Sequence, residues 1–138
     1  MAVRRLNRIR DVIRERFPES RLEPLTVKQL AAVKRRHPKA PAQVLDFFKA
    51  VGCGSIGASR YMIYDLIDAV EIFGKGSEAD LDGIVLIGDD FAGQHEAYDT
   101  KAKWQFGTVG GSGRFQAHTV YRDFVDFIER WFVEDDAG

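Results

Sequence analysis

Cysteine is almost missing from this sequence of 138 residues, and long hydrophobic runs are missing altogether. The single Cys53 cannot form an internal disulfide, which fits a reducing compartment, so we expect a cytoplasmic protein. A membrane-spanning helix is not expected, because it would need an apolar run of about 18 residues. The four prolines mark no linker between two cores, and no internal repeat is visible. These absences favour one soluble domain over residues 1–138.

Aromatic and aliphatic residues are plentiful by contrast. Hydrophobic residues make up 45% of the chain, and ten of its residues are phenylalanine. Such a composition predicts a packed core rather than disorder.

Charge is divided unevenly along the chain. Residues 1–39 hold twelve Lys and Arg against four Asp and Glu, whereas residues 40–138 hold eight against seventeen. The asymmetry bears on partners and association rates rather than on the fold, and a solvated basic helix on an acidic body explains it equally well. Asp11 and Glu15 argue against reading the arginine-rich start as a mitochondrial presequence.

Three helices are predicted in the first half. Residues 3–17 place apolar side chains at steps of three and four, and Pro18 ends that helix. Thr26 and Gln29 have the spacing of a capping box before a second helix, whose apolar side would include Val27 and Val33. A third helix is expected to open at Pro41 and to close at Gly52.

Short strands are predicted in the second half. Residues 61–64 are aromatic and β-prone, whereas residues 65–73 have a helical pattern. The run 84–87 is apolar throughout, which suits a strand covered on both faces. Segments 94–99 and 103–108 indicate a hairpin, and the glycine-rich stretch 107–113 indicates a flexible turn before a short strand at 115–118.

The last predicted helix begins near Val120, with Val120, Phe124, Phe127 and Trp131 facing inward and Asp126 facing out. Helices, then antiparallel strands, then a closing helix predict an α+β fold. We expect N-terminal helices and a C-terminal helix packed on a mainly antiparallel sheet of about four to six strands.

The order of these parts resembles a known family. The residues that carry the resemblance are Thr26 to Val33, Pro41 to Val51, Gly52-Cys53-Gly54, residues 61–73, Gly88-Asp89-Asp90 and Phe124 to Ile128. Over residues 24–133 the chain resembles the SUKH superfamily of bacterial immunity proteins and a fungal cell-wall assembly regulator. Family members commonly carry Leu-Pro and then an aromatic residue where this chain has Ala40-Pro41 and Val44. Residues 1–23, a basic amphipathic extension, lie outside the resemblance.

The resemblance implies an α+β protein-binding domain without known catalytic residues, and it implies neutralisation of bacterial toxins, many of them nucleases. An acidic surface could then occupy the cationic groove of such a toxin. We expect the partner to be bound by a loop and strand around the Gly-Asp-Asp motif. The expected partner-binding residues are Asp89, Asp90, Gln94, His95 and Glu96.

Motifs for enzymatic chemistry lack their required context, so we expect no enzyme, no cofactor and no metal. Residues 52–57 match the letters G-x-G-x-x-G, but they follow a helix instead of opening one, so a cap and turn are favoured. Residues 78–89 place acidic groups at several positions of a calcium loop, but position 1 is Glu and position 12 is Asp, so an acidic loop is favoured.

Isolated reactive side chains are interpreted in the same way. For His37, His95 and His118, solvated or capping roles are favoured over metal ligation. Cys53 is expected near a helix C-terminus, which would raise rather than lower the pKa of its thiol.

Two further hypotheses concern the basic N-terminal helix. It could engage other proteins as part of a regulatory scaffold, or its arginines could contact nucleic acid phosphates. The overall pI of about 6.3 disfavours the nucleic acid interpretation.

Overall fold

A seven-stranded antiparallel sheet organises the computed structural model, which describes residues 2–134. The strands are β1 (Arg21–Glu23), β2 (Cys53–Ile56), β3 (Tyr61–Asp68), β4 (Ile84–Asp89), β5 (His95–Asp99), β6 (Gln105–Val109) and β7 (Phe115–Ala117). The helices are α1 (Ala2–Arg16), α2 (Val27–Arg36), α3 (Ala42–Ala50), α4 (Ala69–Phe73), α5 (Glu78–Leu81) and α6 (Phe124–Ile128), which continues into the π-helical segment η1 (Glu129–Glu134).

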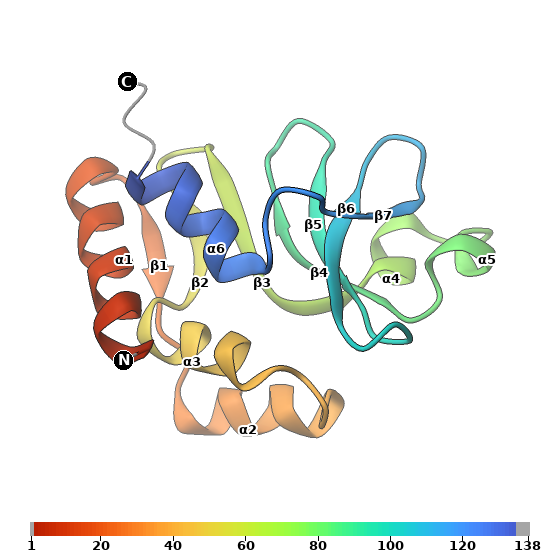
Figure 1. The fold of residues 1–138 in the computed structure, drawn as a ribbon, viewed down its shortest axis with the longest axis horizontal. Coiled ribbons are helices and arrows are strands. Elements are labelled where there is room, and N and C mark those ends of the chain that lie inside the picture. The colour runs from red at the N-terminus through yellow and green to blue at the C-terminus, as the bar shows by residue number, and fades with distance from the viewer. Residues whose placement is uncertain (1, 135–138) are drawn as a thin grey trace.

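Each strand pairs with its neighbours in the sequence, so the spatial order is β1 to β7 (Figure 1). The predicted α+β class and antiparallel sheet are confirmed, but the sheet is larger than the expected four to six strands. The predicted short strand at 115–118 is β7, and the two strands that were not predicted are short, since β1 has three residues and β2 has four. Such segments show too few alternations to be recognised from hydrophobic pattern alone.

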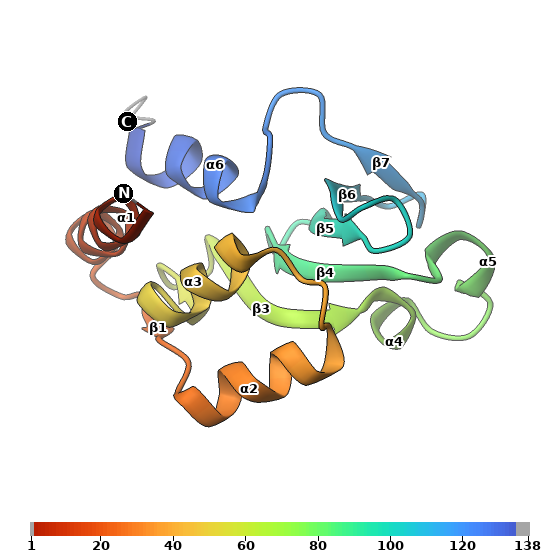
Figure 2. The same cartoon turned by 60° about the horizontal axis from the view of Figure 1, so that its bottom comes forward.

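The sheet has a helical layer on each face (Figure 2). Side chains of β4 point alternately to the two faces. Val85 and Ile87 belong to the large core under α1, α3 and α6. Ile84 and Leu86 belong to a smaller core with α4 and α5. All four side chains are buried, which confirms the predicted strand covered on both faces.

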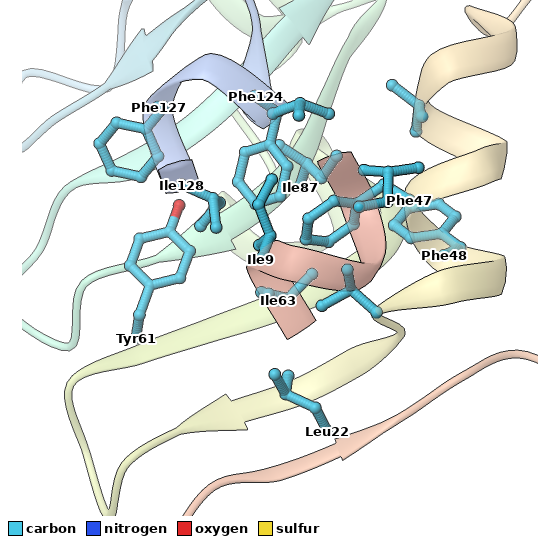
Figure 3. Close-up of a cluster of buried hydrophobic side chains, with 14 of the residues drawn as sticks. Ile9, Leu22, Phe47, Phe48, Tyr61, Ile63, Ile87, Phe124, Phe127 and Ile128 are labelled. Atoms are coloured by element: carbon cyan, nitrogen blue, oxygen red, sulfur yellow. The ribbon is translucent and has the colours of Figure 1, made fainter. Parts of the chain in front are cut away.

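The large core is built from aromatic and aliphatic side chains of both chain halves (Figure 3). Phe47 from α3 meets Phe124 from α6 edge-on, with ring centroids 5.4 Å apart. Tyr61 from β3 lies 5.5 Å from the ring of Phe127. These contacts close the C-terminal helix onto the sheet.

Helix α1 is an integral part of this core rather than an extension. Leu6, Ile9 and Ile13 are buried, and Arg5 pairs with Glu129 of η1 at 2.8 Å. The apolar stripe is therefore occupied inside the molecule, which removes the surface on which the scaffold hypothesis depended. Val3 was expected on the stripe but is 64% exposed.

The helix starts and ends predicted from local signals are largely confirmed. The backbone amide of Thr26 donates to Gln29 Oε1 at 2.8 Å, and the amide of Gln29 donates to Thr26 Oγ1 at 3.1 Å. Pro41 is the residue before α3, and Gly52 follows it with φ of 99°. Val27, expected to face inward, is exposed instead.

Residues 65–68 correct the prediction of a helix over 65–73. They continue β3, because Ile67 and Asp68 pair with Leu86 and Val85 of β4. Only residues 69–73 form a helix. A register shift between Ile63 and Ile67 accompanies the positive φ of Leu66. Pairing with a buried central strand has overridden a local helical pattern.

The last helix begins at Phe124, later than expected, with Asp123 as its N-cap. Val120 and Trp131 are more than half exposed, and Asp126 is buried, so three of the predicted orientations are wrong. The π-helical segment widens the turn, which rotates Trp131 outward and brings Phe132 into the core. No helix among residues 2–134 has the length and apolar character needed to cross a membrane.

Candidate functional site

The loop between β4 and β5, residues 90–94, is shaped by the two carboxylates of the Gly-Asp-Asp motif. Asp89 Oδ1 accepts a hydrogen bond from the amide of Phe91 at 2.8 Å. Asp90 Oδ1 accepts from the amides of Ala92 and Gln94, at 2.8 and 3.0 Å. These bonds hold Phe91 at φ of 62°, with its side chain 49% exposed. The carboxylates therefore build the loop as well as giving it charge.

The five residues expected to bind a partner do not share one surface. His95 and Asp89 are paired across β5 and β4, with His95 Nε2 3.9 Å from Asp89 Oδ2. The Asp89 carboxylate also accepts from the hydroxyl of Tyr64 at 3.1 Å, and the His95 ring lies edge-on to Phe73 of α4. Asp89 and His95 thus lie on the α4 face of the sheet.

Glu96 lies on the opposite face and is removed from solvent. Its side chain is 0% exposed, which corrects the expectation that it meets a partner at the surface. Tyr61 donates its hydroxyl to Glu96 Oε1 at 2.5 Å, and the side-chain amide of Gln94 donates to Oε2 at 3.0 Å. Burial, reinforced by the negative charge of Glu96, raises the pKa of Tyr61 well above its ordinary value.

His118 completes this polar cluster. Its Nε2 lies 3.7 Å from Glu96 Oε2, and the atom is buried without a hydrogen-bond partner. The ring stacks on Phe106 with centroids 4.7 Å apart. His95 and His118 have side chains only 13% and 14% exposed, so the expected solvated or capping role is wrong for both. His37 is the C-cap residue of α2.

Gly88 makes room for the Tyr61–Glu96 pair. It belongs to β4, opposite Glu96 of β5, and a Cβ atom there would lie 1.9 Å from the hydroxyl of Tyr61. Glycine is therefore required by the close approach of a buried phenol. Sequence pattern alone placed this glycine at the boundary between a strand and a loop.

Next to the cluster lies a pocket of about 570 Å³ that we call the aromatic pocket. It is formed by the end of α1, the start of β3, the β4–β5 loop and the C-terminal helix. The lining residues are Arg16, Phe17, Arg60, Tyr61, Asp90, Gln94, Glu96, Phe127, Trp131 and Phe132. Three of the expected partner-binding residues, Asp90, Gln94 and Glu96, are brought together here.

Sequence reasoning missed the remaining lining residues. Phe127 and Trp131 were assigned only to the core, although the indole of Trp131 is 52% exposed and donates to the hydroxyl of Tyr121 at 2.6 Å. At the rim, the guanidinium of Arg60 lies over the ring of Phe17 at 5.3 Å. No local signal joins residues 16–17, 60–61 and 127–132, because they meet only through tertiary packing.

The dismissed motifs have structural explanations. Residues 53–56 of the glycine motif form β2, and a Cβ atom at Gly54 would lie 2.0 Å from the carbonyl oxygen of Arg21. The glycines thus allow β1 to approach. Burial, with a smaller contribution from Asp65, raises the pKa of the Cys53 thiol to about 12. The thiol is therefore a poor nucleophile at neutral pH.

The acidic stretch 78–89 forms α5 and β4 instead of a loop that encircles an ion. In residues 2–134, no three His, Cys, Asp or Glu side chains are grouped to hold a metal ion.

The arrangement as a whole suits binding. A pocket lined by aromatic and polar side chains, with the exposed Trp131 among them, can bind an amphipathic group. Comparison of the chain with protein-family models, with curated proteins and with solved structures finds no match to any of the three.

Proposed function

We propose that this chain is a non-enzymatic protein-binding domain that neutralises a bacterial toxin in the manner of an immunity protein. The observation that carries the proposal is a pair of exposed aromatic residues, one in the lining of the aromatic pocket and one in the β4–β5 loop. Trp131 lines the pocket, and Phe91 follows the lining residue Asp90. Large aromatic side chains beside a concave site are typical anchors of protein interfaces.

Charge supports the same role. The β4–β5 loop carries Asp89 and Asp90 within the acidic part of the chain, residues 40–138. A nuclease toxin needs a cationic groove for phosphates, and an acidic loop complements such a groove and accelerates association. A cytoplasmic location fits a protein that protects its own cell from such a toxin.

The proposal is tested with a candidate toxin domain, sought first among the genes that neighbour the gene for this chain. Binding is measured by calorimetry for the wild type, for Phe91→Ala and for Trp131→Ala. Each substitution should weaken binding by about 30-fold or more, because interface anchors contribute on the order of 2–4 kcal/mol. Ile72→Ala is the matched control, since Ile72 is an exposed apolar residue on α4. Equal affinities for all four proteins would contradict the proposal.

The contribution of charge needs a substitution that preserves the loop. Replacing Asp89 and Asp90 by lysine would remove the bonds that each Oδ1 accepts, whereas asparagine keeps an oxygen acceptor in place. Asp89→Asn with Asp90→Asn should therefore slow association at low salt and leave dissociation nearly unchanged. An association rate equal to that of the wild type at low salt would exclude electrostatic steering by this loop.

A further inference from the structure

The buried carboxylate of Asp126 lies next to two exposed arginines. Its side chain is only 7% exposed. Arg130 Nε lies 3.4 Å and Arg122 Nη2 lies 3.9 Å from the same oxygen, Asp126 Oδ1. The other oxygen, Oδ2, accepts a hydrogen bond from the backbone amide of Arg122 at 3.1 Å. One fixed anion therefore keeps two cationic side chains close to each other, although like charges repel.

Two aromatic side chains adjoin this pair of arginines. The guanidinium of Arg130 lies over the ring of Tyr121, 5.8 Å from its centroid. The hydroxyl of Tyr121 accepts from the indole N–H of Trp131 at 2.6 Å, and Trp131 is 52% exposed. We call Tyr121, Arg122, Asp126, Arg130 and Trp131 the arginine cluster. Trp, Tyr and Arg are the residue types most enriched among those that contribute most to the binding energy of protein interfaces.

The guanidinium groups of the cluster retain donors for a ligand. Within residues 2–134, neither Arg122 nor Arg130 donates a side-chain hydrogen bond. Their side chains are 77% and 51% exposed, so their N–H groups are accessible from solvent. A guanidinium presents five donors in a planar fork that matches the two oxygens of a carboxylate. The cluster can therefore receive a carboxylate from outside.

The acidic groups beside the cluster are less exposed than its arginines. Asp126 is 7% and Glu129 is 13% exposed, and Glu129 is already paired with Arg5 at 2.8 Å. Asp123 is half-buried, and its carboxylate accepts from the amide of Asp126. An approaching ligand therefore meets guanidinium groups before it meets a carboxylate. Because the interaction between charges weakens with distance, the surface of the cluster favours an anion over a cation.

We infer that the arginine cluster binds an acidic side chain of the bound protein, with its carboxylate at Arg122 and Arg130 and its aliphatic part against Trp131. That the occupant is a protein side chain rests on the proposed function, whereas the preference for a carboxylate rests on the cluster alone. The partner then presents an acidic side chain to this cluster in addition to the cationic groove that meets the β4–β5 loop.

The preference is tested with three probes that share one ring: phenylacetate, neutral phenylacetamide and cationic phenethylammonium. Binding is followed at low ionic strength by NMR through the indole N–H signal of Trp131, which Trp131→Ala assigns. Phenylacetate should bind about threefold more tightly than phenylacetamide, an effect in the range of an exposed ion pair, and phenethylammonium should bind most weakly. Equal binding of phenylacetate and phenylacetamide would overturn the inference.

Two single variants assign the preference to the cluster. Arg122→Gln and Arg130→Gln should each reduce the preference for phenylacetate, and each leaves one arginine to compensate the buried Asp126. Arg114→Gln is the matched control, because Arg114 is 74% exposed and lies 3.9 Å from an acidic partner, Asp80. The control should bind all three probes as the wild type does. A preference unchanged in both cluster variants would exclude these arginines as its cause.

Binding of the toxin domain separates this inference from the proposed function. If the toxin domain binds with the same affinity to the wild type and to both cluster variants, the inference is wrong and the proposed function stands. If phenylacetate shows the expected preference and no candidate toxin domain binds, the proposed function fails and the carboxylate preference stands. Both are supported if a toxin variant lacking one surface carboxylate binds more weakly to the wild type but no more weakly to Arg130→Gln than the unmodified toxin does.

Discussion

Tyr61 and Gly88 are the residue pair on which the interior of the site depends. The phenol is buried, and its hydroxyl meets Glu96 in the space left by the absent side chain of Gly88. Neither residue could be assigned this role from the sequence, because the residues are 27 positions apart and lie on different strands. A glycine in a central strand is otherwise costly, since it leaves no side chain to pack.

Gly88→Ala should destabilise the protein strongly. The added Cβ would lie 1.9 Å from the hydroxyl of Tyr61, so the phenol must move and the hydrogen bond to Glu96 must break. We expect a loss of about 2–4 kcal/mol in the free energy of unfolding, measured by urea denaturation. Gly110→Ala is the control, because a Cβ there meets no atom within 4 Å, and its stability should stay within about 0.5 kcal/mol of the wild type. A Gly88→Ala protein as stable as this control would show that the phenol has room to move.

Helix α1 shows that an amphipathic pattern predicts a helix but does not say what its apolar face will contact. Its apolar stripe was correctly recognised, but the stripe was equally compatible with binding another protein. In the structure, Leu6, Ile9 and Ile13 pack in the core and Arg5 pairs with Glu129. The apolar stripe therefore faces the interior of this molecule. Deleting residues 1–18 would consequently disrupt the core and could not test partner binding by itself.

Ile9→Ala should therefore lower stability by about 2–5 kcal/mol, the usual cost of removing a large aliphatic side chain from a core. Ile9 is 0% exposed, whereas Val3 on the same helix is 64% exposed. Val3→Ala should change stability by less than about 0.5 kcal/mol. Thermal or urea unfolding of the two variants makes the comparison, and similar small losses for both would indicate that α1 is dispensable.

Elements defined by local signals were the ones predictable from sequence. The capping box of Thr26 and Gln29 and the apolar run of β4 can each be recognised from a few neighbouring residues. Trp131 illustrates the opposite case, because a regular helical period placed it inward and the π-helical segment η1 rotated it onto the surface. The aromatic pocket itself was not predicted; Asp90, Gln94 and Glu96 were expected only as partner-binding residues, and the other walls depend on tertiary contacts that no short pattern encodes.

The pH dependence of stability is a property of the whole molecule, because it sums contributions from titratable groups on both faces of the sheet. Burial is the leading cause that raises the pKa of Tyr61, Tyr98 and Tyr64 above the ordinary value. It also raises the pKa of Cys53 to about 12. In each case the unfolded chain loses its proton first as the pH rises. Above that pH the native state binds more protons than the unfolded state, so stability falls with increasing pH.

The free energy of unfolding should accordingly begin to fall near pH 9, where the unfolded thiol ionises, and should fall more steeply above about pH 10. Each tyrosine that stays protonated in the native state adds a slope of about 1.4 kcal/mol per pH unit. Tyr61→Phe should be less stable at neutral pH but should show a shallower slope above pH 10. Urea unfolding at a series of alkaline pH values, with tyrosinate absorbance recorded in parallel, measures both quantities. Parallel slopes for the two proteins would exclude Tyr61 as a contributor.

The walls of the aromatic pocket come from distant parts of the chain: Arg16 and Phe17 precede every strand, and Trp131 and Phe132 follow the last of them. A nascent polypeptide synthesised only as far as Phe124 includes the segments of all seven strands but lacks Phe127, Trp131 and Phe132, so it cannot form this cavity. Products of truncated messages would likewise lack it. Recognition through the pocket would thereby depend on synthesis of the C-terminal helix, a consequence of topology alone.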